Sequence, residues 1–227
     1  MKRLLYFLPL GLLAGCVHTH VVREEVTPVD AVYKQILVCS LSNDAERAEL
    51  IETVVNDLLK KHHVKTATCH DFLNTQTAPD RQKQDIQEAG YQAVLVFQRE
   101  SSEEKTGPIP VAAVLQKEDV PEKSSESMES STQTDTLDGF LNAYASRMSA
   151  NEAEVEKASE VTEDTLTGKR RSITGVIKLI DTNQNQVSWL GGGTVEGPAS
   201  EPFKSLMKAV AERAINELSN AGLIPSR

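Results

Sequence analysis

The sequence lacks an apolar run long enough to cross a bilayer as a helix. Its apolar N-terminal stretch, residues 4–15, has twelve residues and is interrupted by Pro9 and Gly11. A hydrocarbon core of about 30 Å requires about 20 apolar residues in a helix. This stretch is therefore too short for a permanent span, and the preceding Lys2 and Arg3 make it typical of an export signal.

Positive charge is also scarce. The formal net charge is −9, which argues against nucleic-acid binding, because phosphate backbones require a basic surface. It also disfavours binding to anionic lipid through surface charge. The imbalance is local, since residues 100–164 contain sixteen acidic and five basic residues and are more negative than the complete chain. The acidity therefore belongs to one segment.

Aromatic residues are few, and the hydrophobic content is modest for a chain of this length. Only 4% of the 227 residues are aromatic and 39% are hydrophobic, so part of the chain is expected to lie outside the core. The length favours one domain with a long insertion.

The end of the apolar stretch carries the most specific motif. Leu13-Ala14-Gly15-Cys16 resembles the lipobox of bacterial lipoprotein precursors, although an ordinary signal with a chance cysteine is the alternative. The resemblance implies removal of residues 1–15 as a signal peptide and acylation of Cys16. Several acyl chains give stable membrane attachment. Val17, in place of Asp, favours sorting to the outer membrane, with the chain facing the periplasm.

The pattern after this motif predicts an α/β fold with an α+β tendency. Residues 16–30 are expected to be a lipidated tether, and residues 31–99 the first part of the domain, with the order β-α-β-α-β and a largely parallel sheet. The first helix of this part has apolar residues at helical spacing and is expected to expose Glu49, Glu52, Asp57 and Lys60.

The second half of the chain divides into an insertion and a return to order. Residues 100–166 are expected to be an acidic, largely disordered insertion, with a short helix possible over residues 137–148. Residues 167–227 alternate as two strands around a turn and end in an amphipathic helix, which completes a mixed sheet with helices packed on it.

Two stretches carry a resemblance to a known group. The sequence YKQILVCSLSNDAERAELIETVVNDLLKKHHVKTATCHDF with EAGYQAVLVF, and the later IKLIDTNQNQVSWLGGGTVEG, resemble small Gram-negative envelope lipoproteins. Their fold is similar to that of the N-terminal domain of TolB and of curli-assembly and penicillin-binding-protein-activator lipoproteins. The resemblance implies a module that binds an envelope protein or assembles with itself, without catalysis. The long acidic insertion departs from the group.

Two clusters invite a site interpretation. The glycines at 191–193 lie within a strand pattern, which favours a bulge or a close backbone approach over a phosphate loop. The residues His62, His63, Cys69 and His70 do not have the paired spacing of a structural zinc site, so no metal is expected, and a metal-binding or small-ligand lipoprotein remains the alternative function.

Cys39 and Cys69 remain once Cys16 is acylated. They fall near the ends of two strands that a β-α-β crossover places side by side, so a disulfide and two buried thiols are both open interpretations. No nucleophile, base and orienting group can be assembled around the neighbours His70 and Asp71. Neither catalytic residues nor a cofactor are therefore expected.

We expect radiolabelled palmitate to label the chain expressed in a Gram-negative host, and Cys16→Ala to abolish the label, because the thiol carries the diacylglycerol. The measurement is fluorography of the precipitated protein. Cys39→Ala, which leaves the lipobox intact, is the matched control. Equal labelling of wild type and Cys16→Ala would refute lipidation at this residue.

Overall fold

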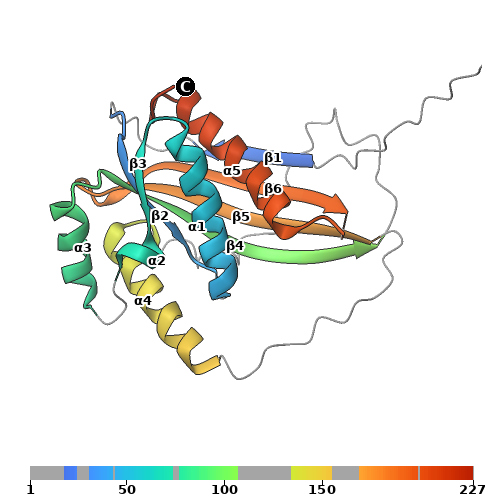
Figure 1. The fold of residues 1–227 in the computed structure, drawn as a ribbon, viewed down its shortest axis with the longest axis horizontal. Helices are drawn as coiled ribbons and strands as arrows, with labels where there is room; N and C mark the ends of the chain where they lie inside the picture. The colour runs from blue at the N-terminus through green and yellow to red at the C-terminus, as the bar shows by residue number, and fades with distance from the viewer. Residues whose placement is uncertain are drawn as a thin grey trace, which may run out of the picture.

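The computed structural model describes residues 18–24, 31–42, 44–73, 77–106, 134–154, 169–198 and 200–226. These residues form a six-stranded sheet with helices on both faces (Figure 1). In chain order the elements are β1 His18–Glu24, β2 Gln35–Ser40, α1 Ala45–Lys60, β3 Lys65–Thr68, α2 Cys69–Phe72, α3 Pro79–Glu88, β4 Ala93–Thr106, α4 Leu137–Glu154, β5 Lys169–Asp181, β6 Gln186–Pro198 and α5 Phe203–Asn220.

The sheet is mixed, in the order β1-β6-β5-β4-β2-β3. Strands β4, β2 and β3 run parallel to one another, while β5, β6 and β1 continue the sheet with antiparallel pairs. The predicted α/β class, with a mixed sheet and helices packed on it, is confirmed. Continuous apolar runs such as Val94–Phe97 in β4 are buried on both faces, as parallel strands between helix layers require.

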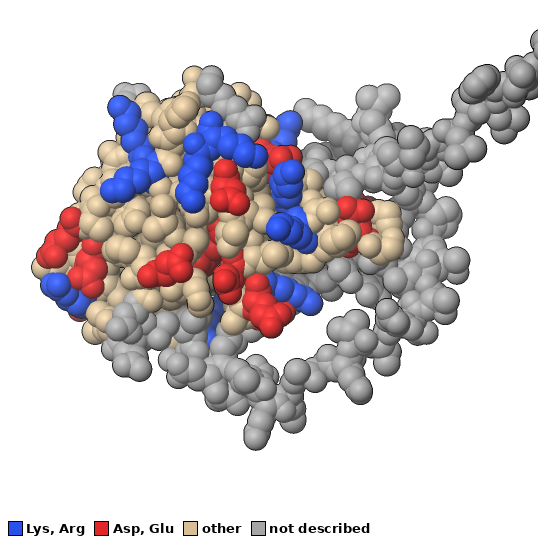
Figure 2. Space-filling model, in the orientation of Figure 1, with Lys and Arg blue, Asp and Glu red and all other residues tan. Residues whose placement is uncertain are grey.

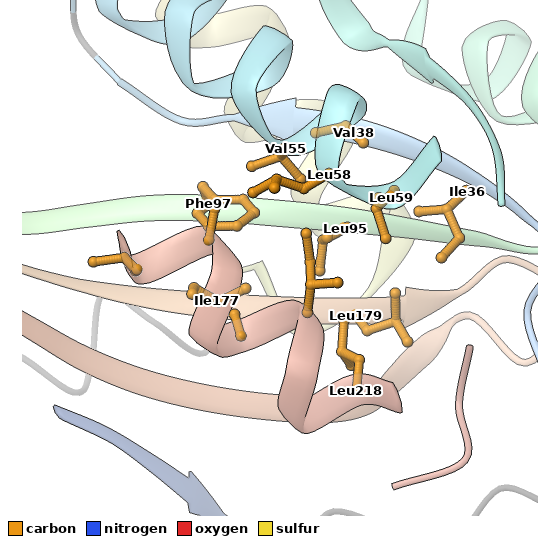
Figure 3. Close-up of a cluster of buried hydrophobic side chains, with 14 of the residues drawn as sticks. Ile36, Val38, Val55, Leu58, Leu59, Leu95, Phe97, Ile177, Leu179 and Leu218 are labelled. Atoms are coloured by element: carbon orange, nitrogen blue, oxygen red, sulfur yellow. The ribbon is translucent and has the colours of Figure 1, made fainter. Parts of the chain in front are cut away.

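Helices α1 and α5 pack side by side on one face of the sheet (Figure 1). Their apolar stripes meet alternate residues of the strands, so that Leu58 and Leu218 face Leu95 and Leu179 (Figure 3). The other face is covered by α2, α3 and α4 over a second core that includes Leu37, Val94 and Val96. Adjacent residues of one strand thus serve opposite cores, because side chains alternate across a sheet.

Strand β1 lies inside the predicted tether. It pairs along its full length with β6, from His18 opposite Glu196 to Glu24 opposite Leu190. The predicted lipidated tether, residues 16–30, therefore includes a strand that belongs to the sheet. The seven residues HTHVVRE show no clean alternation, so local pattern did not indicate a strand. Pairing with a partner about 170 residues away supplies the hydrogen bonds that the local sequence does not signal.

The predicted insertion, residues 100–166, also contributes to the fold. Residues 100–106 continue β4, paired with the start of β5, although they are almost entirely polar. Helix α4 is longer than the predicted short helix, and it buries an apolar face in the second core: Leu137, Phe140, Leu141 and Tyr144. Residues 107–133 and 155–166 of the predicted insertion lie outside the described residues.

The turn between β5 and β6 fixes the start of α4. Asn185 Oδ1 accepts hydrogen bonds from Leu137 N at 2.9 Å and Asp138 N at 3.4 Å, although it lies 47 or more residues away in sequence. Asn185 has a φ of 55°, which Asn tolerates better than most residues. Its Nδ2 donates to Asp138, which also forms an ion pair with Lys83 of α3. The cap of α4 is therefore provided by tertiary structure.

A buried lysine holds the residues before α4. Lys178 of β5 is 1% exposed, and its Nζ donates to Thr134 Oγ1 at 2.8 Å and to Asp135 Oδ1 at 2.6 Å. A buried ammonium group requires such partners, because the loss of its hydration without compensation costs on the order of several kcal/mol. Lys178 thus holds the chain that enters α4, within the insertion that was predicted to be largely disordered.

The glycine triplet lies in the middle of β6, between β1 and β5, which excludes a phosphate loop. The indole of Trp189 lies over Gly191, since a Cβ built on Gly191 would be 2.4 Å from Cη2 of Trp189. Trp189 itself is 1% exposed. The predicted close approach is therefore made by a side chain two positions earlier on the same strand face.

We expect Gly191→Ala to lower the free energy of unfolding by about 1–3 kcal/mol, because the new methyl group must displace a fully buried indole. Gly192→Ala is the matched control, since a Cβ there meets nothing within 4 Å. It should change stability by less than about 0.5 kcal/mol. Urea unfolding followed by circular dichroism measures both, and equal stability of the two variants would contradict the packing described for Trp189.

Candidate functional site at the disulfide-bridged strand ends

A disulfide joins the carboxyl ends of two neighbouring parallel strands. The register pairs Val38 of β2 with Thr68 of β3, so the next residues, Cys39 and Cys69, lie side by side. They form a disulfide with their Cα atoms 4.9 Å apart, and both are fully buried. Of the two interpretations that the sequence left open, the structure has the disulfide.

Glu52 of α1 is buried beside this bridge. Glu52 is 1% exposed, and its carboxylate accepts hydrogen bonds from Ser40 N at 2.9 Å and from His70 N at 3.0 Å. The expectation that Glu52 faces water is therefore wrong. Glu52, Val55 and Leu59 are spaced i, i+3 and i+7, so they share one side of α1, and the latter two are buried core residues. That spacing was the signal available in the sequence.

The carboxylate of Glu52 serves as the anion at the start of α2. This helix has only one turn, and its N-cap Thr68 accepts a hydrogen bond from Asp71 N at 3.2 Å. Glu52 satisfies the amide of His70, which the cap leaves free. Amide groups at a helix start favour a negative charge. One side chain thus ties α1 to both β2 and α2.

Burial raises the pKa of Glu52 from 4.5 to about 7, because the carboxylate loses its water. The amides of His70 and Ser40 oppose this effect by stabilising the charged form, whereas the negative charge of nearby Asp71 adds to it. Burial thus favours the protonated form of Glu52, whereas the two amides favour the carboxylate.

A small cavity adjoins Glu52. It has a volume of about 20 Å³ and is lined in part by Ser40, Leu41, His70, Tyr144 and Arg147. A cavity of roughly 10–15 Å³ suffices for one water molecule. This cavity has room for about one water molecule, so it gives no support to the alternative function of small-ligand binding.

Polar groups of α4 close the cavity. The guanidinium of Arg147 donates to the carbonyl oxygen of Leu41, and burial lowers its pKa. Burial, and secondly the charge of Glu52, raises the pKa of Tyr144. The hydroxyl of Ser40 is buried and has no hydrogen-bond partner within the described part of the chain. A water molecule in the cavity would satisfy it.

The remaining predicted site residues do not gather here. His62 and His63 follow the C-terminal end of α1, ten and eleven residues beyond Glu52, and His62 Nδ1 lies 3.2 Å from the carbonyl oxygen of Pro225. The side chain of His70 is exposed. Within the described ranges no three His, Cys, Asp or Glu residues are grouped to hold a metal. Cys16 lies outside these ranges.

A second buried polar group lies at the other end of the parallel strands. Tyr33 donates to Asp181 Oδ2 at 2.9 Å, and burial raises the pKa of Tyr33 to about 12. Asp181 Oδ1 accepts from the amides of Asn183 and Gln184, both at 2.8 Å. These two bonds place Asp181 at the start of the predicted turn between the two strands. Both carboxylate oxygens of Asp181 accept hydrogen bonds from other residues of the domain, so the Tyr33–Asp181 pair has a structural role.

The arrangement defines a three-layer α/β protein whose polar strand ends are filled by its own side chains. No family model matches the sequence, and no curated protein matches it. Among solved structures, the chain is similar to two structures of the PelC dodecamer from Paraburkholderia phytofirmans. One has 12% sequence identity and a TM-score of 0.47, over 93% of this chain and 99% of that chain. The other has 11% identity and a TM-score of 0.48, over 92% and 100%. We draw no functional conclusion from similarity at this level.

We expect the stability of the protein to fall as the pH rises from about 4.5 to about 7, relative to Glu52→Gln. The folded-state pKa of Glu52 lies above its unfolded value, so the native state holds the proton more tightly and loses this advantage as the pH rises through the folded pKa. The effect is on the order of 3 kcal/mol at most, at about 1.4 kcal/mol per pKa unit.

Urea unfolding across this pH range measures the slope. Glu49→Gln, which removes an exposed charge from the same helix, is the control and should retain the wild-type slope. If Glu52→Gln and wild type show parallel pH profiles, then Glu52 does not titrate in this range.

Proposed function

We propose that this chain is a lipid-anchored protein of the bacterial envelope that faces the periplasm. In this proposal it acts without catalysis, by binding an envelope protein or by assembling with itself. The Cys16 lipobox supports the anchor, and the resemblance to envelope lipoproteins supports the role. No helix among the described residues is long and apolar enough to cross a membrane. In the proposal the acyl chains on Cys16 provide the attachment, and sorting to the outer membrane follows from Val17.

The buried disulfide supports an extracytoplasmic location. Disulfides persist in oxidising compartments such as the periplasm and are rare in the cytosol of mesophiles. Cys39 and Cys69 are both 0% exposed and join β2 to α2 within the second core. This bridge is therefore a constitutive part of the packing, and it fits a chain that folds after export.

The observation that carries the binding role is the position of β1. Among the described strands, β1 pairs with β6 on one side only, so its other side presents backbone donors and acceptors along seven residues. An unpaired strand edge is a ready template for another strand. The opposite edge strand, β3, has only four residues. Strand β1 is thus the longer template, and it lies next to the proposed anchor.

We expect a photo-crosslinking amino acid placed at Thr19 or Val21 of β1 to capture a partner in cells. The same group at Lys60, which is exposed at the C-terminal end of α1, is the control and should give fewer adducts. Mass spectrometry then distinguishes a second copy of this chain from a different envelope protein. No adduct from either β1 position, in acylated protein at the membrane, would refute the role of this edge.

The acidic insertion, residues 100–166, provides a second part of the test. Deletion of residues 107–133 leaves β4 and Thr134 intact, so the folded part retains its pairing. If the adducts from β1 persist after this deletion, the edge strand alone binds the partner. If they disappear while the deletion variant retains the unfolding transition of wild type, the acidic segment is part of the binding surface.

A further inference from the structure

The disulfide between Cys39 and Cys69 is closed to reagents in the folded protein. Both cysteines are 0% exposed, and both belong to the second core. A thiol reduces a disulfide by direct attack of its thiolate on one sulfur, so the reaction depends on access to that sulfur. The bridge therefore reacts only after a movement that brings one of its sulfurs to solvent.

The sheet holds the two cysteines differently. Cys39 is a residue of β2, which pairs with β4 on one side and with β3 on the other. Cys69 follows the last pair of β2 with β3, Val38 opposite Thr68, and it begins α2. Strand β3 lies at the edge of the sheet and has only four residues. Because local opening of a native protein involves its least stable segments, α2 is expected to move and β2 is not.

Helix α2 is a single turn whose own hydrogen bonds do not fasten it to the sheet. Thr68 Oγ1 accepts a hydrogen bond from Asp71 N at 3.2 Å, and Leu73 N donates to the carbonyl oxygen of Cys69 at 2.8 Å. Both bonds lie within residues 68–73. They maintain the shape of the turn without joining it to another helix or to β2.

Glu52 of α1 supplies such a connection. Its Oε2 accepts a hydrogen bond from His70 N at 3.0 Å, and its Oε1 accepts one from Ser40 N at 2.9 Å. His70 follows Cys69 in the sequence, and Ser40 follows Cys39. One buried carboxylate thus holds the residue after each cysteine, on the two segments that the disulfide joins.

We propose that Glu52 controls the reduction of this disulfide. A thiol reaches the bridge through a local opening in which α2 leaves Glu52 while the sheet remains folded. The two hydrogen bonds of Glu52 set how often that opening occurs, so the redox sensitivity of the folded protein is decided by a side chain of α1. This inference depends neither on the proposed anchor nor on the proposed partner.

Dithiothreitol, a small dithiol, serves as the probe. Its thiolate attacks one sulfur of the bridge and forms a mixed disulfide, while the other cysteine leaves as a thiolate. The second thiol of the probe then displaces the remaining cysteine and closes a cyclic disulfide. In total the bridge gains two electrons and two protons, and the dithiol loses the same number.

Three changes in α1 separate local from global opening. Glu52→Met removes both acceptor oxygens but keeps an unbranched side chain of similar length, so the amides of His70 and Ser40 lose their partner. Glu52→Gln retains one acceptor oxygen. Val55→Ala lowers the stability of the whole domain, because Val55 is 0% exposed and lies in the core on the other face of the sheet from the bridge.

Glu49→Gln is the control for the loss of charge. Glu49 is exposed on the same helix, and the face that α1 and α5 cover carries charges of both signs (Figure 2). The mature chains are first treated with iodoacetamide, which blocks any thiol that is already free. Mass spectrometry then counts the thiols that appear with dithiothreitol, at one pH and at several urea concentrations below the unfolding transition.

We expect Glu52→Met to be reduced about tenfold faster than wild type, because hydrogen bonds to a charged group have an energy of that order. Glu52→Gln should have an intermediate rate. Val55→Ala and Glu49→Gln should keep the wild-type rate. None of the rates should increase with urea until global unfolding begins, because a local opening exposes little surface.

Two outcomes overturn the inference. If the rates of wild type and Val55→Ala rise with urea as steeply as the global unfolding constant, the bridge opens only when the whole domain unfolds. If both Glu52 variants keep the wild-type rate, Glu52 does not control the opening. Should Glu52→Met fail to fold, Glu52→Gln decides: acceleration beyond its own loss of global stability supports the inference, and acceleration that matches this loss refutes it.

Discussion

The antiparallel pairing of β4 with β5 is the interaction on which the rest of the fold depends. It runs from Ala93 opposite Asp181 to Thr106 opposite Lys169, while β4 also pairs in parallel with β2. Strand β4 therefore joins the parallel half of the sheet to the antiparallel half. The segment between β4 and β5 is long, but the entropic cost of closing a flexible loop rises by only about 0.6 kcal/mol for each doubling of its length. A ladder of thirteen residue pairs, buried on both faces over its inner part, tolerates such an insertion.

The groups at the carboxyl ends of the parallel strands explain why the proposed role rests on a strand edge and not on a binding crevice. In open α/β sheets, ligands commonly bind in the crevice at the carboxyl ends of the parallel strands. Here Glu52, the Cys39–Cys69 disulfide and the guanidinium of Arg147 occupy that place, and the remaining cavity has room for about one water molecule. The fold uses these groups to join α1, α2 and α4 to β2. Among the described strands, the unpaired side of β1 is the edge on which the proposed role rests.

Much of the architecture follows from patterns of short range. The apolar runs of β2 and β4, the alternation in β5 and β6, and the helical stripes of α1 and α5 each identify an element without knowledge of its neighbours. Glu52 shows the limit of such reasoning. Glu52 lies beside the apolar stripe of α1, but this position alone does not predict burial, because a carboxylate is not buried without partners. The partners are the backbone amides of Ser40 and His70, which only the folded structure brings to Glu52.

Local sequence was sufficient for the α/β class, for the turn built on Asp181 and for the prediction that Cys16 carries the anchor, because each depends on residues close together in the chain. Distant contacts decided the rest. Strand β1 exists because β6 pairs with it, α4 is fixed because Asn185 and Lys178 reach it, and Cys39 meets Cys69 because β2 and β3 are in register. The physical reason is common to all three. Backbone amides, a buried ammonium group and a thiol each acquire a partner only when the chain is folded, and a pattern of neighbouring residues does not contain that partner.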